Sequence, residues 1–101
     1  MTGALEAEAR PKPKVSKVYL KETLTRLRSN PEDLDALFAF GTWLAMTERF
    51  DESVEVLHEI TKRDPNYPGV WVLKSQVYRR MGKSRMAELC MERDLALQAS
   101  S

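Results

Sequence analysis

The chain has 101 residues, which is enough for one small domain and too few for most two-domain enzymes. Hydrophobic residues make up 43% and charged residues 31% of it, a composition typical of a folded domain and not of a disordered chain. A formal net charge of +1 excludes the uniform basic field of a dedicated nucleic-acid-binding protein, so nucleic acid is an unlikely partner.

The first predicted elements are a tail and one helix. Residues 1–14 lack apolar periodicity and contain Pro11 and Pro13, so we expect a flexible tail. Residues 15–30 form an amphipathic helix that ends before Pro31, because proline disfavours helical geometry in the residue before it. Leucines recur along this helix at helical spacing, at Leu20, Leu24 and Leu27.

Two further helices are predicted over residues 32–46 and 50–62, separated by a short turn. The first has a broad apolar stripe and begins with acidic side chains, which suit the positive end of the helix dipole. The second has apolar residues on its inward face, among them Phe50, and glutamates outward. Residues 64–68 are dense in turn formers and must end it.

The last two helices are predicted over residues 70–81 and 85–99. Gly82 ends the first of them, and Ser84 is placed to cap the second. The apolar stripe of the last helix consists of Ala87, Cys90, Met91 and Leu95. No segment alternates with period two for long, so no strand is expected.

The chain matches itself at an offset of 34 residues. Pro31 and Pro65 are separated by this distance, and apolar or small residues coincide at several other positions. These pairs are Leu37 with Trp71, Leu44 with Tyr78, Ser53 with Ala87, and Leu57 with Met91. A period of this length is typical of a helix-turn-helix unit that must stack on neighbours to bury its apolar face.

On these residues the sequence resembles the tetratricopeptide repeat family, whose units follow the pattern W-x2-L-G-x2-Y, A-x3-F and P. The resemblance implies an all-α fold of antiparallel helix-turn-helix units, stacked as a short right-handed α-solenoid of about five helices. Residues 15–30 would be a cap helix, 34–67 the first unit and 68–101 the second. The motif residues are Leu37, Phe40, Gly41, Leu44, Ser53, Leu57 and Pro65 in the first unit, and Trp71, Ser75, Tyr78, Ala87 and Met91 in the second.

Some positions depart from the family pattern. Lys74 stands where the family has an apolar residue and Asp94 where it has a small one, so the second unit is predicted to have the polar character of a terminal, solvent-facing unit. The leucines of residues 15–30 fall one residue out of register with the repeat. That segment is therefore interpreted as a cap and not as half of a further unit.

The sequence contains no convergent set of catalytic groups. His58 is the only His, and we expect a solvated or edge-packed side chain. Cys90 lies on a helical stripe with no His placed to activate it, which indicates a buried, inert thiol. No nucleotide, hydrolase or metal motif is present. We therefore expect a protein that is not an enzyme and that uses no cofactor or metal.

Recognition is the remaining chemistry. The resemblance implies that the first helix of each unit lines a concave groove, and the family positions that face it map onto Asp35, Phe38, Thr42, Ala45 and Met46, and onto Gly69, Val72, Gln76, Arg79 and Arg80. Family members that grip a C-terminal carboxylate use Lys, Asn and Arg at several of these positions, where this chain has Phe38, Thr42, Val72 and Gln76. That activity is not supported.

The predicted groove is instead mostly apolar with a basic rim. It would suit an amphipathic helix, or an extended apolar peptide that bears an acidic group. The alternative for Phe38 and Val72 is an ordinary core role, and for Arg79 and Arg80 a solvated face. The leading hypothesis is a small adaptor that binds a segment of another protein.

Charge along the chain supports a second hypothesis, self-association. Residues 1–30 carry +4, residues 31–60 carry −7 and residues 61–101 carry +4, so the net charge is a sum of basic, acidic and basic blocks. Such blocks, together with exposed apolar faces, could join copies of the chain into a salt-sensitive oligomer. No apolar run approaches the ~20 residues of a membrane span, so we expect a cytoplasmic protein that does not act in the membrane.

Overall fold

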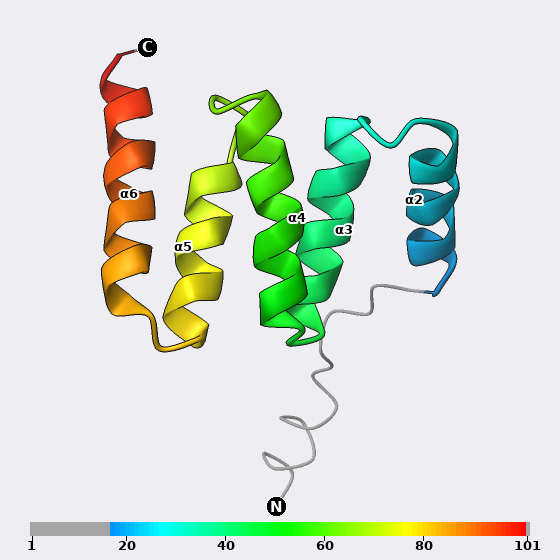
Figure 1. The fold of residues 1–101 in the computed structure, drawn as a ribbon, viewed down its shortest axis with the longest axis horizontal. Coiled ribbons are helices and arrows are strands. Elements are labelled where there is room, and N and C mark those ends of the chain that lie inside the picture. The colour runs from blue at the N-terminus through cyan, green and yellow to red at the C-terminus, as the bar shows by residue number, and fades with distance from the viewer. Residues whose placement is uncertain (1–16, 101) are drawn as a thin grey trace, which may run out of the picture.

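The computed structural model describes residues 17–100, and every regular element in that range is a helix (Figure 1). In chain order the helices are α2 (Lys17–Ser29), α3 (Leu34–Met46), α4 (Phe50–Arg63), α5 (Val70–Arg80) and α6 (Ser84–Ala99). The prediction of an all-α fold with about five helices is confirmed. The tail predicted for residues 1–14 lies outside the described residues.

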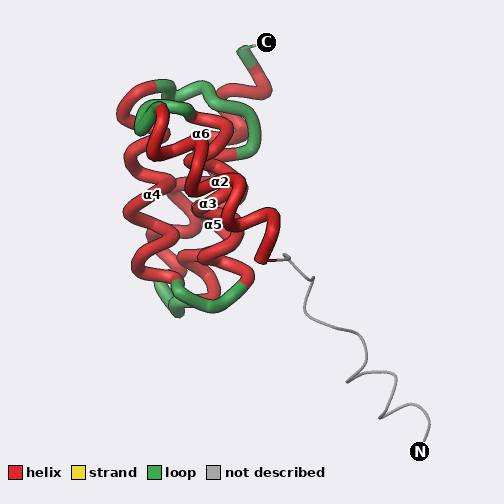
Figure 2. The backbone as a smooth tube through the Cα atoms, turned by 90° about the vertical axis from the view of Figure 1, so that its right-hand side faces the viewer, coloured by secondary structure: helices red, strands yellow, loops and turns green. Residues whose placement is uncertain are grey.

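Neighbouring helices pack in the order of the sequence and form two close pairs. α3 packs on α4 and α5 packs on α6, each pair being joined by a short turn that makes its helices antiparallel. α4 also packs on α5, and the two first helices, α3 and α5, touch each other. The view in Figure 2 accordingly places α4 to one side of α3 and α5. α2 covers α3 at one end of the row, and α6 covers α5 at the other.

The turns inside the two pairs repeat one backbone conformation at an offset of 34 residues. Glu48 has a φ of 64° and Gly82 a φ of 77°, so both lie in the left-handed region. The next amide then donates a hydrogen bond back into the preceding helix, from Arg49 to the Leu44 carbonyl at 2.8 Å and from Lys83 to the Tyr78 carbonyl at 2.9 Å. The repeat seen in the sequence is thus present in the backbone.

The segments that lead into α3 and α5 repeat in the same way. The Glu32 amide donates to Asn30 Oδ1 at 3.1 Å, and the Asn66 amide donates to Asp64 Oδ1 at 2.9 Å, which are two side-chain turns again 34 residues apart. The end of α2 therefore has the local backbone structure of the end of α4. α2 is in backbone register with the second helix of a unit, although its leucines are not.

α3 begins at Leu34, two residues later than the predicted start, because Asp33 serves as its N-cap. The Ala36 amide donates to Asp33 Oδ1 at 3.0 Å, and Arg26 of α2 donates to both oxygens of the same carboxylate. The hydrogen bond from Ala36 and the charge of Arg26 hold the pKa of Asp33 below its usual range. One carboxylate thus starts α3 and ties α2 to it.

The core lies between α4 and α5. Leu57 and Ile60 of α4 meet Val70 and Val77 of α5, and each of the four is at most 2% exposed. Burial of side chains of this size contributes roughly 1.5–3 kcal/mol each. This cluster joins the two helix pairs into one body.

Small residues allow close approach within each pair. A Cβ atom at Gly41 would lie 2.8 Å from Cδ2 of Leu57, and Ser53 Oγ donates to the Gly41 carbonyl at 2.8 Å. The equivalent residues of the second pair, Ser75 and Ala87, are fully buried. In the first pair the serine is on the second helix, α4, whereas in the second pair it is on the first helix, α5. Ser75 Oγ is the one buried side-chain N or O atom in the described range that has no hydrogen-bond partner.

Two predictions for α6 are wrong. Ser84 does not cap the helix but is its first residue, and no side-chain cap precedes it. Leu95, expected on the inward stripe, is 58% exposed. Among the described helices α6 contacts only α5, so it buries the narrow strip of Ala87 and Cys90 and leaves the rest of its surface open.

We expect Gly82→Ala to lower the free energy of unfolding by about 1–2 kcal/mol, the cost of a left-handed conformation for a residue with a Cβ. No atom lies within 4 Å of a Cβ built at this position, so the loss would report backbone conformation and not a clash. Urea denaturation followed by circular dichroism measures it. Lys83→Ala, at an ordinary φ of −98°, is the control, and equal stability of the two variants would contradict the prediction.

Candidate functional site

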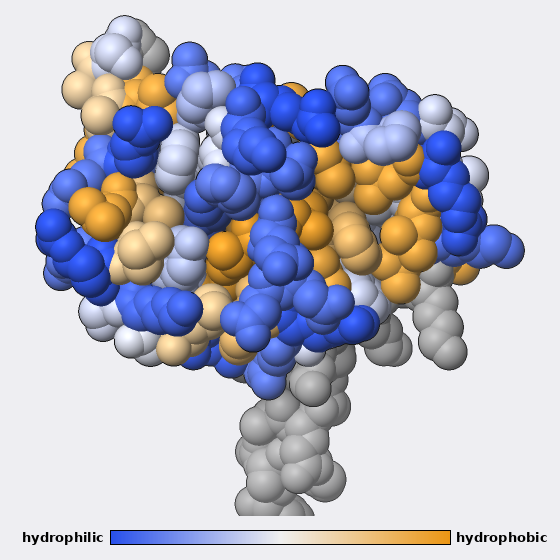
Figure 3. Space-filling view, in the orientation of Figure 1, coloured by the Kyte–Doolittle hydropathy of each residue, from blue (hydrophilic) through white to orange (hydrophobic). Residues whose placement is uncertain are grey.

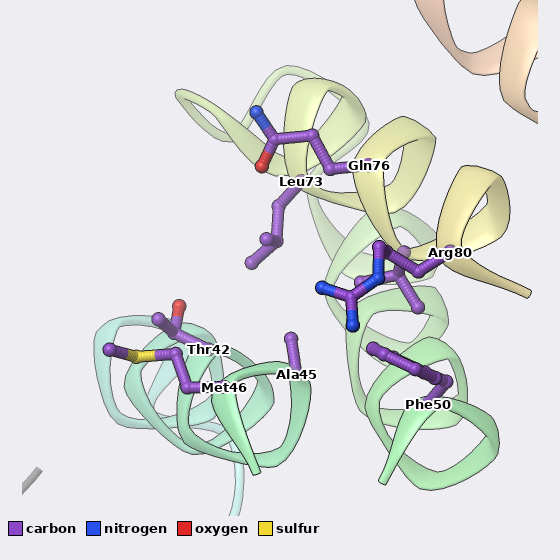
Figure 4. A pocket seen from close by; sticks show the side chains of 8 residues that line it. Thr42, Ala45, Met46, Phe50, Leu73, Gln76 and Arg80 are labelled. Atoms are coloured by element: carbon purple, nitrogen blue, oxygen red, sulfur yellow. The ribbon is translucent and has the colours of Figure 1, made fainter. Parts of the chain in front are cut away.

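A pocket of about 210 Å³ opens between α3 and α5, the first helices of the two pairs (Figure 4). Its wall comes from three helices, with residues at i, i+3 and i+4 on α3 and at i, i+3, i+4 and i+7 on α5. The lining residues are Thr42, Ala45 and Met46 of α3, Phe50 of α4, and Leu73, Gln76, Val77 and Arg80 of α5. Apolar side chains predominate in this lining, and the polar groups are one hydroxyl, one amide and one guanidinium.

Several of the residues predicted for the groove lie together in this pocket. They are Thr42, Ala45, Met46, Gln76 and Arg80. Phe50, predicted on the inward face of its helix, also lines the pocket, as do Leu73 and Val77, for which the sequence indicated no role in the groove. These three side chains belong both to the core and to the pocket lining, because the core between α4 and α5 extends to the pocket. A helical stripe in a sequence does not show where a core ends and a groove begins.

Arg80 is held in place at the rim. Its guanidinium lies over the ring of Phe50, with 5.1 Å from Cζ to the ring centroid, and donates to Glu48 Oε2 at 3.1 Å. Both charged side chains are more than 60% exposed, so the ion pair contributes at most about 1 kcal/mol to stability. Its effect is to orient Arg80 beside the pocket, as Figure 4 shows for the side chain.

Asp35 and Phe38, also predicted for the groove, contact the segment between α4 and α5 instead. The Tyr67 hydroxyl donates to Asp35 Oδ1 at 2.5 Å, and the ring centroids of Phe38 and Tyr67 lie 5.3 Å apart. Burial, together with the hydrogen bond to Asp35, raises the pKa of Tyr67 to about 12. These contacts anchor the linker segment onto α3.

The remaining predicted residues do not line the pocket. Gly69 has a φ of 82° and precedes α5, Val72 is half-buried, and Arg79 is exposed. Of the two arginines of the predicted basic rim, Arg80 is paired with Glu48. The rim is therefore less positive than the sequence indicates.

Lys74 forms a second cluster, between α5 and α6. It is 5% exposed, so the prediction that it gives the second unit a solvent-facing character is wrong. Its Nζ lies 4.7 Å from the centroid of the Trp71 ring, and Cζ of Arg93 lies 5.0 Å from the same centroid. The Lys74 ammonium thus makes a cation–π contact with the Trp71 ring, at a position where the repeat pattern has an apolar residue.

Burial governs ionisation in the Lys74 cluster. It lowers the pKa of Lys74 and raises the pKa of the nearby Cys90 thiol. Cys90 is 4% exposed, as predicted for an inert thiol, and His58 is exposed, as predicted. Within residues 17–100 no three His, Cys, Asp or Glu side chains are grouped to hold a metal ion.

A further hollow, of about 370 Å³, lies between α2 and α3, and the sequence did not predict it. Leu20 and Leu24 of α2 and Trp43 of α3 supply its apolar wall, with Lys21 and Arg28 at the edge. Figure 3 shows apolar surface over this end of the molecule and polar surface over α4. The leucines that are out of register with the repeat are thus partly open at the surface.

No protein-family model matches the chain, and no curated protein matches it. None of the described helices is long and apolar enough to cross a membrane. What the fold defines is an all-helical protein built from two similar helix pairs with a covering helix at the N-terminal side.

We expect stability to fall as the pH rises from 10.0, the ordinary pKa of tyrosine, towards about 12, the pKa of folded Tyr67. In that range the unfolded chain loses the phenol proton and the folded chain keeps it, so the folded state binds more protons and is disfavoured by raising the pH. Tyr67→Phe should flatten the fall. Urea denaturation across this pH range tests it, and parallel profiles for the two proteins would contradict the assignment.

Proposed function

We propose that this chain is a non-catalytic protein-interaction module of the tetratricopeptide type, which binds a helix or peptide of a partner protein in the pocket between α3 and α5. The observation that carries the proposal is the pocket itself, an apolar wall with a polar rim on the two adjacent first helices. The 34-residue repetition of turn geometry and hydrogen bonds supports the assignment of the helix pairs as repeat units.

The chemistry of the pocket favours an amphipathic partner. A volume of about 210 Å³ is enough for one or two apolar side chains and too little for a drug-sized or cofactor-sized ligand. The hydroxyl of Thr42 donates its hydrogen to the Phe38 carbonyl at 2.8 Å, which leaves the Gln76 amide and the Arg80 guanidinium as the hydrogen-bond donors for a ligand. A partner helix can place its apolar stripe on the wall and its polar flank at these two side chains.

The probe for this proposal is an acetylated and amidated helical peptide of about 16 residues, with leucines at i, i+4 and i+7. Met46→Lys should weaken its binding about tenfold or more, because the substitution places a cation against the apolar stripe. Fluorescence anisotropy with a labelled peptide measures the affinity.

Met86→Lys is the matched control, since Met86 is 41% exposed on α6, away from the pocket. Lys and Met have similar helix propensities, so neither change should unfold its helix. Equal affinities of the two variants for the peptide would remove the pocket as the binding site.

The alternative, a self-associating scaffold, is favoured by a different observation. The large hydrophobic side chains that are exposed in the described range all lie on the two terminal helices, at Val18, Tyr19, Met86, Leu89 and Leu95. The exposed large hydrophobic side chains of the described range are thus found at the ends of the row. The charge blocks support this alternative less, because the acidic block is paired with both basic blocks inside the chain, through Arg26 with Asp33 and Arg80 with Glu48.

If copies associate through α6, Leu89→Glu combined with Leu95→Glu should give a monomer under conditions where the unmodified chain forms oligomers. Exposed side chains are changed, so the fold should tolerate both substitutions. Light scattering over a range of protein and salt concentrations decides the matter. A monomeric wild-type chain at high concentration and low salt rules self-association out.

A further inference from the structure

Glu48 occupies a backbone position for which its side chain is poorly suited. Its φ of 64° belongs to the left-handed region, and the equivalent residue of the second unit is Gly82, which adopts that region without a steric penalty. A non-glycine residue in this conformation points to a role for the side chain. The turn places that side chain next to the pocket described above.

The side chain of Glu48 reaches across to the other helix pair. Its Oε2 accepts a hydrogen bond from Nη2 of Arg80 at 3.1 Å, and the two residues are 32 positions apart. Within the described residues, Arg80 is the one cation that lines the pocket, and Glu48 is its one carboxylate partner. Contact with the Phe50 ring fixes the same guanidinium from another side.

Arg80 retains donor capacity for a ligand. A guanidinium has five N–H donors, and the structure records one hydrogen bond from that of Arg80. Arg79 and Lys83, which are close to Arg80 in the sequence, make no ion pair with another described residue. An apolar wall with one oriented guanidinium at its rim is complementary to an apolar segment that carries a carboxylate.

We propose that Glu48 is an internal competitor for Arg80: its carboxylate engages the guanidinium that an acidic side chain of the partner segment would bind. The inference rests on the proposed function, and it specifies the partner as an apolar helix with a carboxylate beside its apolar stripe. Glu48 weakens the binding of that carboxylate by repulsion and by sharing Arg80. Segments that combine a good apolar fit with the acidic group are thereby selected over merely acidic ones.

Two probe peptides separate these contributions. Both are the acetylated and amidated leucine-stripe helix of about 16 residues described above, and they differ in one residue at the border of the stripe, Glu in one and Gln in the other. Glu48→Gln should raise affinity for the Glu peptide roughly two- to fivefold, the size expected for an exposed charge pair, and leave affinity for the Gln peptide unchanged. The gain should shrink as salt is added.

Three controls test whether a gain in affinity comes from the Glu48–Arg80 pair. Glu52→Gln removes another exposed carboxylate, one paired with Arg49 at 2.8 Å, and should not raise affinity for the Glu peptide. Arg80→Gln should weaken binding of the Glu peptide, and adding Glu48→Gln to it should give no further gain. Glu48→Gln keeps the size of the side chain at an exposed position, so urea denaturation should find it folded.

The outcomes distinguish the inference from the function on which it depends. If wild-type protein binds both peptides and Glu48→Gln gives no gain, or the same gain for both peptides, or a gain that Glu52→Gln matches, the competitor role is overturned and the groove stands. If wild-type protein binds neither peptide, the proposed function fails and the inference fails with it. A gain confined to the Glu peptide and dependent on Arg80 supports both.

Discussion

The structure depends on the apolar contact between α4 and α5. Leu57, Ile60, Val70 and Val77 are buried there, and they are the principal link between the two helix pairs. Since α3 is fixed to α4 by the close approach at Gly41, the contact also sets the separation of α3 from α5. The pocket is a consequence, because it is the space that remains between the first helices once the second helix of one unit is packed on the next unit.

Charge reinforces this packing and does not oppose it. The acidic stretch of the chain receives cations from both sides, from Arg26 on α2 to Asp33, and from Arg63 and Arg80 to Glu32 and Glu48. The pairs with Glu32 and Glu48 are exposed and contribute at most about 1 kcal/mol each, and Asp33 is the one half-buried member, so the pairs do not replace the apolar core. They favour the observed arrangement of the helices, because a slip of one helix past another would separate the paired charges. Complementarity of the blocks is therefore used largely inside the chain.

The sequence was sufficient for the helices and insufficient for particular side chains. Helical spacing and the breakers near Pro31 and Pro65 locate α2 to α6 to within a few residues, because both depend on local backbone preferences. Lys74 and Leu95 were predicted wrongly because burial depends on which neighbour is present. A long aliphatic stem beside Trp71 buries a lysine, and a helix at the end of a row leaves a leucine exposed. Asp35 and Phe38 show the same limit, since their contact with Tyr67 joins segments that no local pattern relates.

In α2 the backbone follows the 34-residue repeat, whereas the apolar side chains do not. Its end repeats the hydrogen bonds at the end of α4, yet Thr23 stands where α4 has Leu57, and Arg26 stands where α4 has Ile60. Those α4 positions belong to the core between α4 and α5. In α2, Thr23 is only 5% exposed, whereas Arg26 is exposed and pairs with Asp33. The leucines are displaced by one residue, and two of them line the hollow beside Trp43. The exposed Arg26 at a core position agrees with the interpretation of α2 as a cap, while the backbone alone would indicate one more repeat.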